Sequence, residues 1–175
     1  MDRNQSVLIN LRHQKKPACL LALAAALLAG CATKAERAAQ QAEQVRLVAT
    51  ALQQRRYSID IQQMTPRRGG LRPVSYGFSL AVKGDTLVSY LPYFGRVYSV
   101  PYAGSGKGLN FTGRIREYTD EQPKPGVRRV RLKVANEEDA YLFAINVYDS
   151  GQATIDLQAR ERESVSYSGE VRQLP

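Results

Sequence analysis

The chain has 175 residues, enough for one domain and short for two, and its 43% hydrophobic and 23% charged residues are ordinary for a globular protein. The formal net charge of +9 is compatible with a simple solubility charge, so no nucleic-acid partner is predicted. The sequence has only one histidine and two cysteines, which are few for Ser-His-Asp or Cys-His catalysis and for a zinc site with the usual His and Cys ligands.

The first 30 residues have the layout of a secretory signal. A basic start containing Arg12, Lys15 and Lys16 is followed by an apolar run from Pro17 to Gly30. As a helix this run of about 14 residues would cover about 21 Å, less than the hydrocarbon core of about 30 Å, so a membrane-spanning helix is not predicted. A buried core helix is not favoured either, because the run has no polar face.

The apolar run ends in Leu28-Ala29-Gly30-Cys31, which resembles the lipobox of bacterial lipoprotein signals at all four positions. The resemblance implies that Cys31 receives a diacylglycerol on its sulfur, that the chain is cut before Cys31, and that the new amino group is acylated, for example with palmitate. Two or more fatty chains anchor a protein stably to a membrane. Ala32 is not an Asp-type signal for inner-membrane retention, which favours the outer membrane. Whether the domain faces the periplasm or the cell surface is left open.

Removal of residues 1–30 simplifies the chemistry of the mature chain. His13 and Cys19 are discarded and Cys31 is lipidated, so the remainder has no histidine, no free thiol and no disulfide. The discarded part carries four cations and one anion, which leaves a net charge of +6. No metal site and no cofactor are therefore predicted.

A helix is predicted from Thr33 to about Arg56, because this stretch is rich in good helix formers and lacks glycine and proline. Its apolar positions repeat every three or four residues, but they are mostly alanine and bury little area. A tether that packs its last turns on the domain is favoured over a helix that binds a partner. The predicted organisation is a signal over 1–30, a lipidated cysteine and helical tether over 31–56, and a β domain over 57–175.

After Tyr57 the pattern changes to the period-two alternation of β-strands. Two hairpins stand out, with turns at 83–85 and 149–151, and strands are also predicted at 57–64, 96–102, 108–118, 126–134 and 164–171. About eight short strands follow one N-terminal helix, with no alternation of strands and helices. The predicted fold is mainly β: an antiparallel sandwich or open barrel.

Because the mature chain has no histidine and no free thiol, an enzyme built on it would have to use Asp or Glu side chains for catalysis. A glycan hydrolase needs two Asp or Glu side chains at a suitable separation. Asp85 and Asp149 are better explained as turn formers, and residues 137–139 are predicted to form an exposed acidic turn. The sequence nominates no pair among the candidates, which are Asp60, Asp85, Glu117, Asp149 and Asp156.

The segment from Tyr90 to Tyr102 combines aromatic residues, an arginine and the chain breakers proline and glycine. Aromatic rings with arginine on irregular backbone are typical of surfaces that bind a sugar, a peptide or a protein. The alternative is a strand crossover whose rings fill the end of the core. Tyr93, Phe94 and Arg96 are the residues predicted to contribute to a binding surface.

The order "VKGDTLVSYLPYFGRVY", an F-x-G strand, "FAINVYDSGQATIDLQARER" and a closing "SVSYSGEV" resembles DUF4251, a family of Bacteroidetes lipoproteins. The resemblance covers about residues 45–173, with "LPYFGR" as its most specific block. It implies a secreted or lipid-anchored envelope protein with a mainly antiparallel sheet. It implies no activity and no catalytic residues.

These observations favour a lipid-anchored envelope protein, not an enzyme, whose β domain binds or scaffolds an envelope protein or a glycan. One alternative is an accessory subunit that engages its complex through helix 33–56. A second alternative is the carboxylate-dependent glycan hydrolase.

Overall fold

The computed structural model describes residues 34–98 and 109–175, so the predictions for Cys31 and Tyr102 lie outside the described residues. Among the described residues, one helix, α2 (Lys34–Gln53), precedes the strands. The strands are β1 (Arg56–Pro66), β2 (Arg72–Pro73), β3 (Ser79–Lys83), β4 (Thr86–Leu91), β5 (Leu109–Lys124), β6 (Val127–Ala135), β7 (Ala140–Tyr148), β8 (Gln152–Ala159) and β9 (Val165–Gln173).

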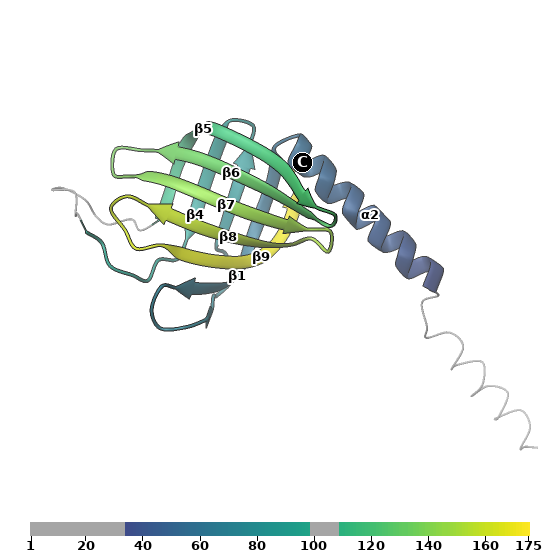
Figure 1. Cartoon of the computed structure of the whole chain (residues 1–175), viewed down its shortest axis with the longest axis horizontal. Helices are drawn as coiled ribbons and strands as arrows, with labels where there is room; N and C mark the ends of the chain where they lie inside the picture. Colours follow the sequence, from purple (N-terminus) through teal and green to yellow (C-terminus); the bar gives the residue numbers. More distant parts are fainter. Residues whose placement is uncertain (1–33, 99–108) are drawn as a thin grey trace, which may run out of the picture. The chain divides into compact units, whose positions relative to one another are not determined.

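The strands form one antiparallel sheet that closes on itself. Its order is β2-β1-β3-β4-β5-β6-β7-β8-β9, and β1 also pairs with β9. Eight strands therefore make a barrel, and β2 is an extra strand on the edge of β1; in Figure 1, strands β6, β7 and β8 cross in front of β4. The predicted antiparallel β domain with one preceding helix is confirmed, and closure selects the barrel over the sandwich.

The interior of the barrel is filled by one cluster of apolar side chains. Alternate residues of each strand point inward, and in β1 these are Tyr57, Ile59 and Ile61, all at most 5% exposed. β7 contributes the fully buried ring of Phe143 to the same cluster. Burial of such side chains contributes about 1.5–3 kcal/mol each and drives the chain to fold.

Closure of the barrel depends on a close approach of β1 to β9. The pairing is regular from Tyr57 to Ile61, shifts by one residue at Gln62, and continues to Pro66. At the shift, a Cβ atom on Gly169 would collide with the backbone carbonyl of Asp60. Only glycine fits there, because the obstacle is main chain and cannot rotate away.

The helix lies within the predicted range but ends at Gln53, because β1 already begins at Arg56, and it packs through its last turns. Val48, Ala51 and Leu52 are buried, whereas Lys34 to Glu43 are exposed on all sides. The hydroxyl of Tyr118 in β5 donates a hydrogen bond to the carbonyl oxygen of Leu52 at 3.4 Å. Within residues 34–98 and 109–175, the structure contains no helix with the length and apolar character needed to cross a membrane.

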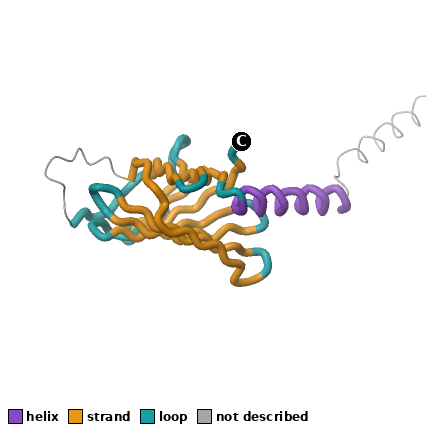
Figure 2. The backbone as a smooth tube through the Cα atoms, turned by 90° about the horizontal axis from the view of Figure 1, so that it is seen from above, coloured by secondary structure: helices purple, strands orange, loops and turns teal. Residues whose placement is uncertain are grey.

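The barrel has two ends, which we call the helix end and the distal end. At the helix end β1 begins and β9 finishes, and the Leu174 amide donates to the Arg56 carbonyl oxygen at 3.1 Å. The distal end holds the start of β9, the segment Arg160–Ser164 that leads into it, and the segment Pro92–Tyr98 that follows β4. Figure 2 shows the last turns of α2 meeting one end of the sheet.

Local details differ from the sequence prediction in three places. The alternating pattern extends back to Tyr76, but the first strand of the first hairpin begins at Ser79 and Tyr76 lies in the connection before it. β5 continues through Pro123 to Lys124, beyond residue 118 where the predicted strand ends. The chain at 96–98 forms a single bridge, between Val97 and Arg162, where a strand was predicted, and the rest of that strand lies outside the described residues.

Two buried tyrosines provide a matched test of this interior. The Tyr57 hydroxyl has no hydrogen-bond partner among the described residues, whereas the Tyr167 hydroxyl donates to the Pro92 carbonyl oxygen at 2.7 Å. Tyr57→Phe should leave the free energy of unfolding unchanged or raise it by about 1 kcal/mol, since it removes an unpaired polar group. Tyr167→Phe should lower it by about 1 kcal/mol. Urea unfolding measures both, and equal losses in the two variants would contradict the assignment.

Candidate functional site

The predicted binding segment crosses the distal end and is held there by Tyr93. Tyr93 is half-buried, and its ring packs on the core. Its hydroxyl donates to the carbonyl oxygen of Arg96 at 2.7 Å and lies 3.3 Å from the carbonyl oxygen of Glu163. Burial raises the pKa of this hydroxyl above its ordinary value, although the contact with the Glu163 carbonyl acts in the opposite direction. Tyr93 therefore positions the segment, and its neighbours form the surface.

The segment is tied to the chain before β9 by backbone bonds. The amide of Glu163 donates to the Arg96 carbonyl oxygen at 3.0 Å, and the amide of Tyr98 donates to the Glu161 carbonyl oxygen at 2.8 Å. In return the Glu163 carboxylate accepts a hydrogen bond from the Arg96 amide at 3.2 Å. These bonds connect two parts of the sequence about 65 residues apart and fix the irregular backbone.

Arg162 and Asp139 are buried beneath this junction, and Glu138 beside them is partly buried. The Arg162 side chain is 6% exposed, with Nη2 3.2 Å from Glu138 Oε2 and Nε 3.9 Å from Asp139 Oδ2. Its guanidinium also lies 5.7 Å from the centre of the Tyr93 ring. Removing one partner of such a pair leaves an uncompensated charge, so the cluster is stable only when complete.

Asp139 corrects the prediction of an exposed acidic turn at 137–139. Glu137 is exposed as predicted, but Asp139 is only 4% exposed. Asp139 Oδ1 accepts hydrogen bonds from the amides of Ala140, Arg160 and Glu161 at 2.7, 2.9 and 3.2 Å. The carboxylate thus satisfies backbone donors of a neighbouring loop, which requires its burial.

The exposed part of the site consists of Phe94, Arg96 and two arginines from another segment. We call Arg68, Arg72, Phe94 and Arg96 the distal surface. The Phe94 ring is 52% exposed, and the Arg72 guanidinium lies over it, 4.0 Å from the ring centre. Arg68, Phe94 and Arg96 line a pocket of about 330 Å³ together with Tyr93, Gly95 and Glu163. This combination of an exposed ring and cations can bind an acidic group.

The five candidate carboxylates do not converge. Asp60 pairs with Arg172 at 2.8 Å, Asp85 with Arg55 at 3.3 Å and Glu117 with Lys133 at 2.8 Å. Asp85 and Asp149 lie in hairpin turns, and Asp156 accepts a hydrogen bond from Ser166 at 2.6 Å. Asp60 does line a pocket with Glu170, a residue that the sequence does not nominate. In the part of the chain that the structure describes, no three His, Cys, Asp or Glu side chains are grouped as a metal site requires.

Residues that sequence reasoning missed come from distant segments. Arg68 and Arg72 lie in a stretch predicted only as a loop, and Arg162 and Glu163 lie just beyond a predicted hairpin. The arginine that lies over the exposed Phe94 ring is Arg72 rather than Arg96. The cluster of Arg67, Arg68 and Arg72 was the one signal that could have indicated a basic patch.

These features define an all-antiparallel closed β barrel with an N-terminal helix and an aromatic, arginine-rich distal end. The family described as "Domain of unknown function (DUF4251)" matches residues 39–171, so the chain belongs to the DUF4251 family. Among solved structures it is similar to a crystal structure of a DUF4251 family protein from Bacteroides eggerthii DSM 20697. That similarity has a TM-score of 0.58 and 13% identity, over 76% of this chain and 91% of the other. No curated protein matches the chain.

Asp139 provides a test of the buried cluster. Asp139→Ala should lower the free energy of unfolding by about 2 kcal/mol or more, because the amides of Arg160 and Glu161 lose their acceptor. Glu137→Ala, two residues away and exposed, should change it by about 0.5 kcal/mol or less. Chemical denaturation measures the difference. Equal stability of the two variants would show that the Asp139 carboxylate is not needed to hold the loop.

Proposed function

We propose that this chain is a lipid-anchored protein of the bacterial cell envelope, and that its barrel is a non-catalytic module that binds an acidic protein partner at the distal surface. Cys31 carries the lipid, residues 33–56 are the tether, and the outer membrane is the favoured site. The lipobox at residues 28–31 supports the compartment. The observation that carries the binding role is Phe94, half-exposed beneath the Arg72 guanidinium on a loop held by Tyr93.

Binding is favoured over catalysis by the chemistry of the side chains. The one histidine, His13, precedes the proposed cleavage point, so the mature chain has no imidazole base. Four of the carboxylate candidates are each held by a cation or a hydroxyl, which suits structural roles. Glycan hydrolysis is therefore the less favoured alternative.

The charge of the distal surface favours an acidic partner. The side chains of Arg67, Arg68 and Arg96 are exposed and make no ion pair with the described part of the chain. A rigid aromatic residue surrounded by arginines is a frequent composition for the centre of a protein interface. Contact with such a surface through exposed charges weakens as salt is added, because ions screen it.

The anchor is tested by Cys31→Ser in full-length protein expressed in a bacterium that processes lipoproteins. The wild-type chain should partition with membranes, and mass analysis should find residue 31 at the N-terminus with added acyl chains. Cys31→Ser should lose the acyl mass and leave the signal uncut. Cys19→Ser is the matched control and should behave as wild type. A wild-type chain with Met1 in place and an unmodified Cys31 would refute the anchor.

The distal surface is tested by placing a photo-crosslinking residue at position 94 in intact cells. We expect one envelope protein to be captured from position 94 and not from position 148, where Tyr148 is a 38% exposed control at the helix end. Arg68→Glu and Arg96→Glu together should reduce capture about tenfold or more, because they repel an acidic partner. Capture that is equal from both positions, or insensitive to the charge reversal, would count against the distal surface.

The same experiment addresses the role of helix 33–56 as a partner-binding element. Residues 34–43 are exposed, so a crosslinking residue at Ala38 can report a helix-bound partner. Capture from Ala38 alone would favour the accessory-subunit alternative over the distal surface.

A further inference from the structure

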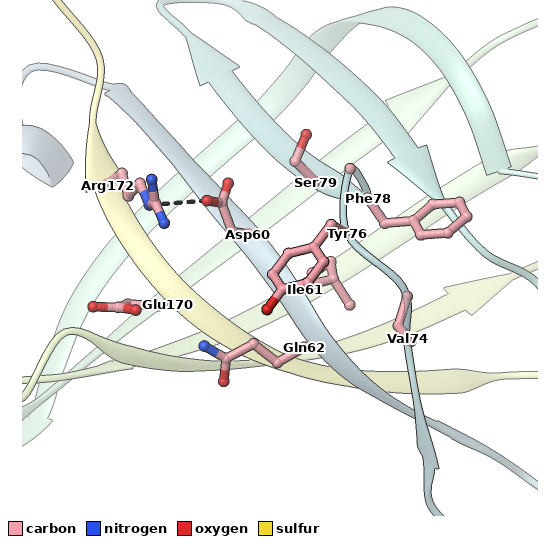
Figure 3. A pocket seen from close by; sticks show the side chains of 10 residues that line it. Asp60, Ile61, Gln62, Val74, Tyr76, Phe78, Ser79, Glu170 and Arg172 are labelled. Atoms are coloured by element: carbon pink, nitrogen blue, oxygen red, sulfur yellow. Dashed lines mark ion pairs between the residues drawn. The ribbon is translucent and has the colours of Figure 1, made fainter.

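A second pocket lies on the outer wall of the barrel and shares no lining residue with the distal pocket. Its volume is about 400 Å³, within the range of small-molecule sites. Figure 3 shows side chains of two neighbouring strands, β1 and β9, on one side and those of the connection before β3 on the other. The residues from β1 and β9 are Asp60, Ile61, Gln62, Glu170 and Arg172, those from the connection are Val74, Tyr76, Gly77 and Phe78, and Ser79 is the first residue of β3.

The pocket arises because β1 changes its partner at this point. β3 pairs with β1 only as far as Asp60. Beyond it the Ile61 amide donates to the Phe78 carbonyl oxygen at 2.9 Å, and the Val74 amide donates to the Gln62 carbonyl oxygen at 3.0 Å. These two bonds hold the connection along the edge of β1 and place Tyr76 between them. Backbone hydrogen bonds thus preform the wall of the pocket.

Two carboxylates on the strands face outward at the same level. Asp60 and Glu170 are directly opposite each other in the β1–β9 pair, where like charges are unfavourable. Arg172 Nε lies 2.8 Å from Asp60 Oδ2 and offsets one of the two charges. Glu170 makes no ion pair or side-chain hydrogen bond with the residues that the structure describes, so its oxygens remain available to a ligand.

Tyr76 adds an aromatic ring with no packing partner. It is fully exposed, whereas the neighbouring Phe78 is stacked on Tyr90 with ring centres 5.1 Å apart. A bare tyrosine ring beside a polar pocket offers a flat apolar face and a hydroxyl to a bound molecule. The pocket therefore combines one apolar surface with hydrogen-bond acceptors and donors at its base.

We propose that this pocket binds one pyranose ring of a neutral glycan, with Tyr76 against the apolar face of the sugar and Asp60 and Glu170 accepting hydrogen bonds from its hydroxyl groups. Gln62 and Arg172 supply donors for the same hydroxyl groups, which both donate and accept. A sugar matches this mixture because it has an apolar C–H face and a polar rim.

Other ligand classes fit the pocket less well. An anionic ligand meets two carboxylates against one guanidinium, which repels it. A divalent cation needs several oxygen ligands, and Arg172 already holds one of the two carboxylates. A purely apolar ligand would leave Glu170 and Gln62 without hydrogen bonds. The site shares no residue with the proposed lipid anchor or with the distal surface, so its test is independent of both.

The test uses the full-length chain, purified in a detergent without a sugar headgroup. Methyl glycosides of glucose, mannose, galactose and N-acetylglucosamine, with their short neutral oligomers, are measured by ligand-observed NMR at millimolar concentration, and glucuronate is included as an acidic sugar. We expect at least one neutral sugar to bind and to outcompete glucuronate. Tyr76→Ala and Glu170→Gln should each weaken its binding about tenfold. Tyr148→Ala, at another partly exposed tyrosine, should leave binding unchanged.

Thermal unfolding of each variant separates a lost contact from a lost fold, and Glu170→Gln retains the size of the side chain if Tyr76→Ala is unstable. The proposal is overturned if no neutral sugar binds at millimolar concentration. It is also overturned if folded Tyr76→Ala and Glu170→Gln bind as well as wild type, or if glucuronate binds more tightly than the neutral sugars.

Discussion

The pairing of β1 with β9 is the constraint on which the rest of this structure depends. It closes the sheet, so that neither strand is left with a row of unpaired amide and carbonyl groups. The approach is close enough that a side chain on Gly169 would collide with the main chain of Asp60. A single glycine therefore permits the closure that encloses the apolar cluster. The other strands are positioned around the barrel by that closure.

Closure also determines where polar chemistry is found. An interior filled with apolar side chains has no room for it, so the polar groups lie at the distal end and on the outer wall. At the distal end the buried Arg162 and Asp139, with the partly buried Glu138, hold two loops in place, and Phe94 nearby is exposed. On the outer wall, the change of partner along β1 beyond Asp60 produces the pocket that contains Asp60 and Glu170. Both surfaces are thus consequences of strand geometry, although they differ in charge: the first is basic and the second is acidic.

The features that sequence predicted well are local ones. The hairpins at 83–85 and 149–151 are specified by turn residues between alternating apolar positions, and both form as predicted. Barrel closure joins residues more than 100 positions apart and depends on Gly169, which alternation does not distinguish from any other small residue. The burial of Asp139 was missed for the same reason, because its acceptor role involves amides about 20 residues away.

At the candidate site, too, the sequence identified residues within one segment but not the residues that reach it from distant segments. The sequence selected Tyr93, Phe94 and Arg96 from their composition, and the structure separates them into a half-buried support, Tyr93, and two exposed neighbours. It did not select Arg72, which reaches Phe94 from a segment more than 20 residues earlier. Asp60 was nominated without a partner, because Glu170 is brought opposite it only by the β1–β9 register.

The hydrogen bond from the Leu174 amide to the Arg56 carbonyl oxygen places the first and last strands of the barrel beside each other at their outer ends. A short peptide can therefore join residue 174 to residue 56, and the chain can be opened instead at the turn between β5 and β6. Such a circular permutant keeps every strand neighbour, but it separates the barrel from the last turns of α2, whose Val48, Ala51 and Leu52 belong to the core cluster. The order of the strands along the chain can thus change while their neighbours in the folded barrel stay the same.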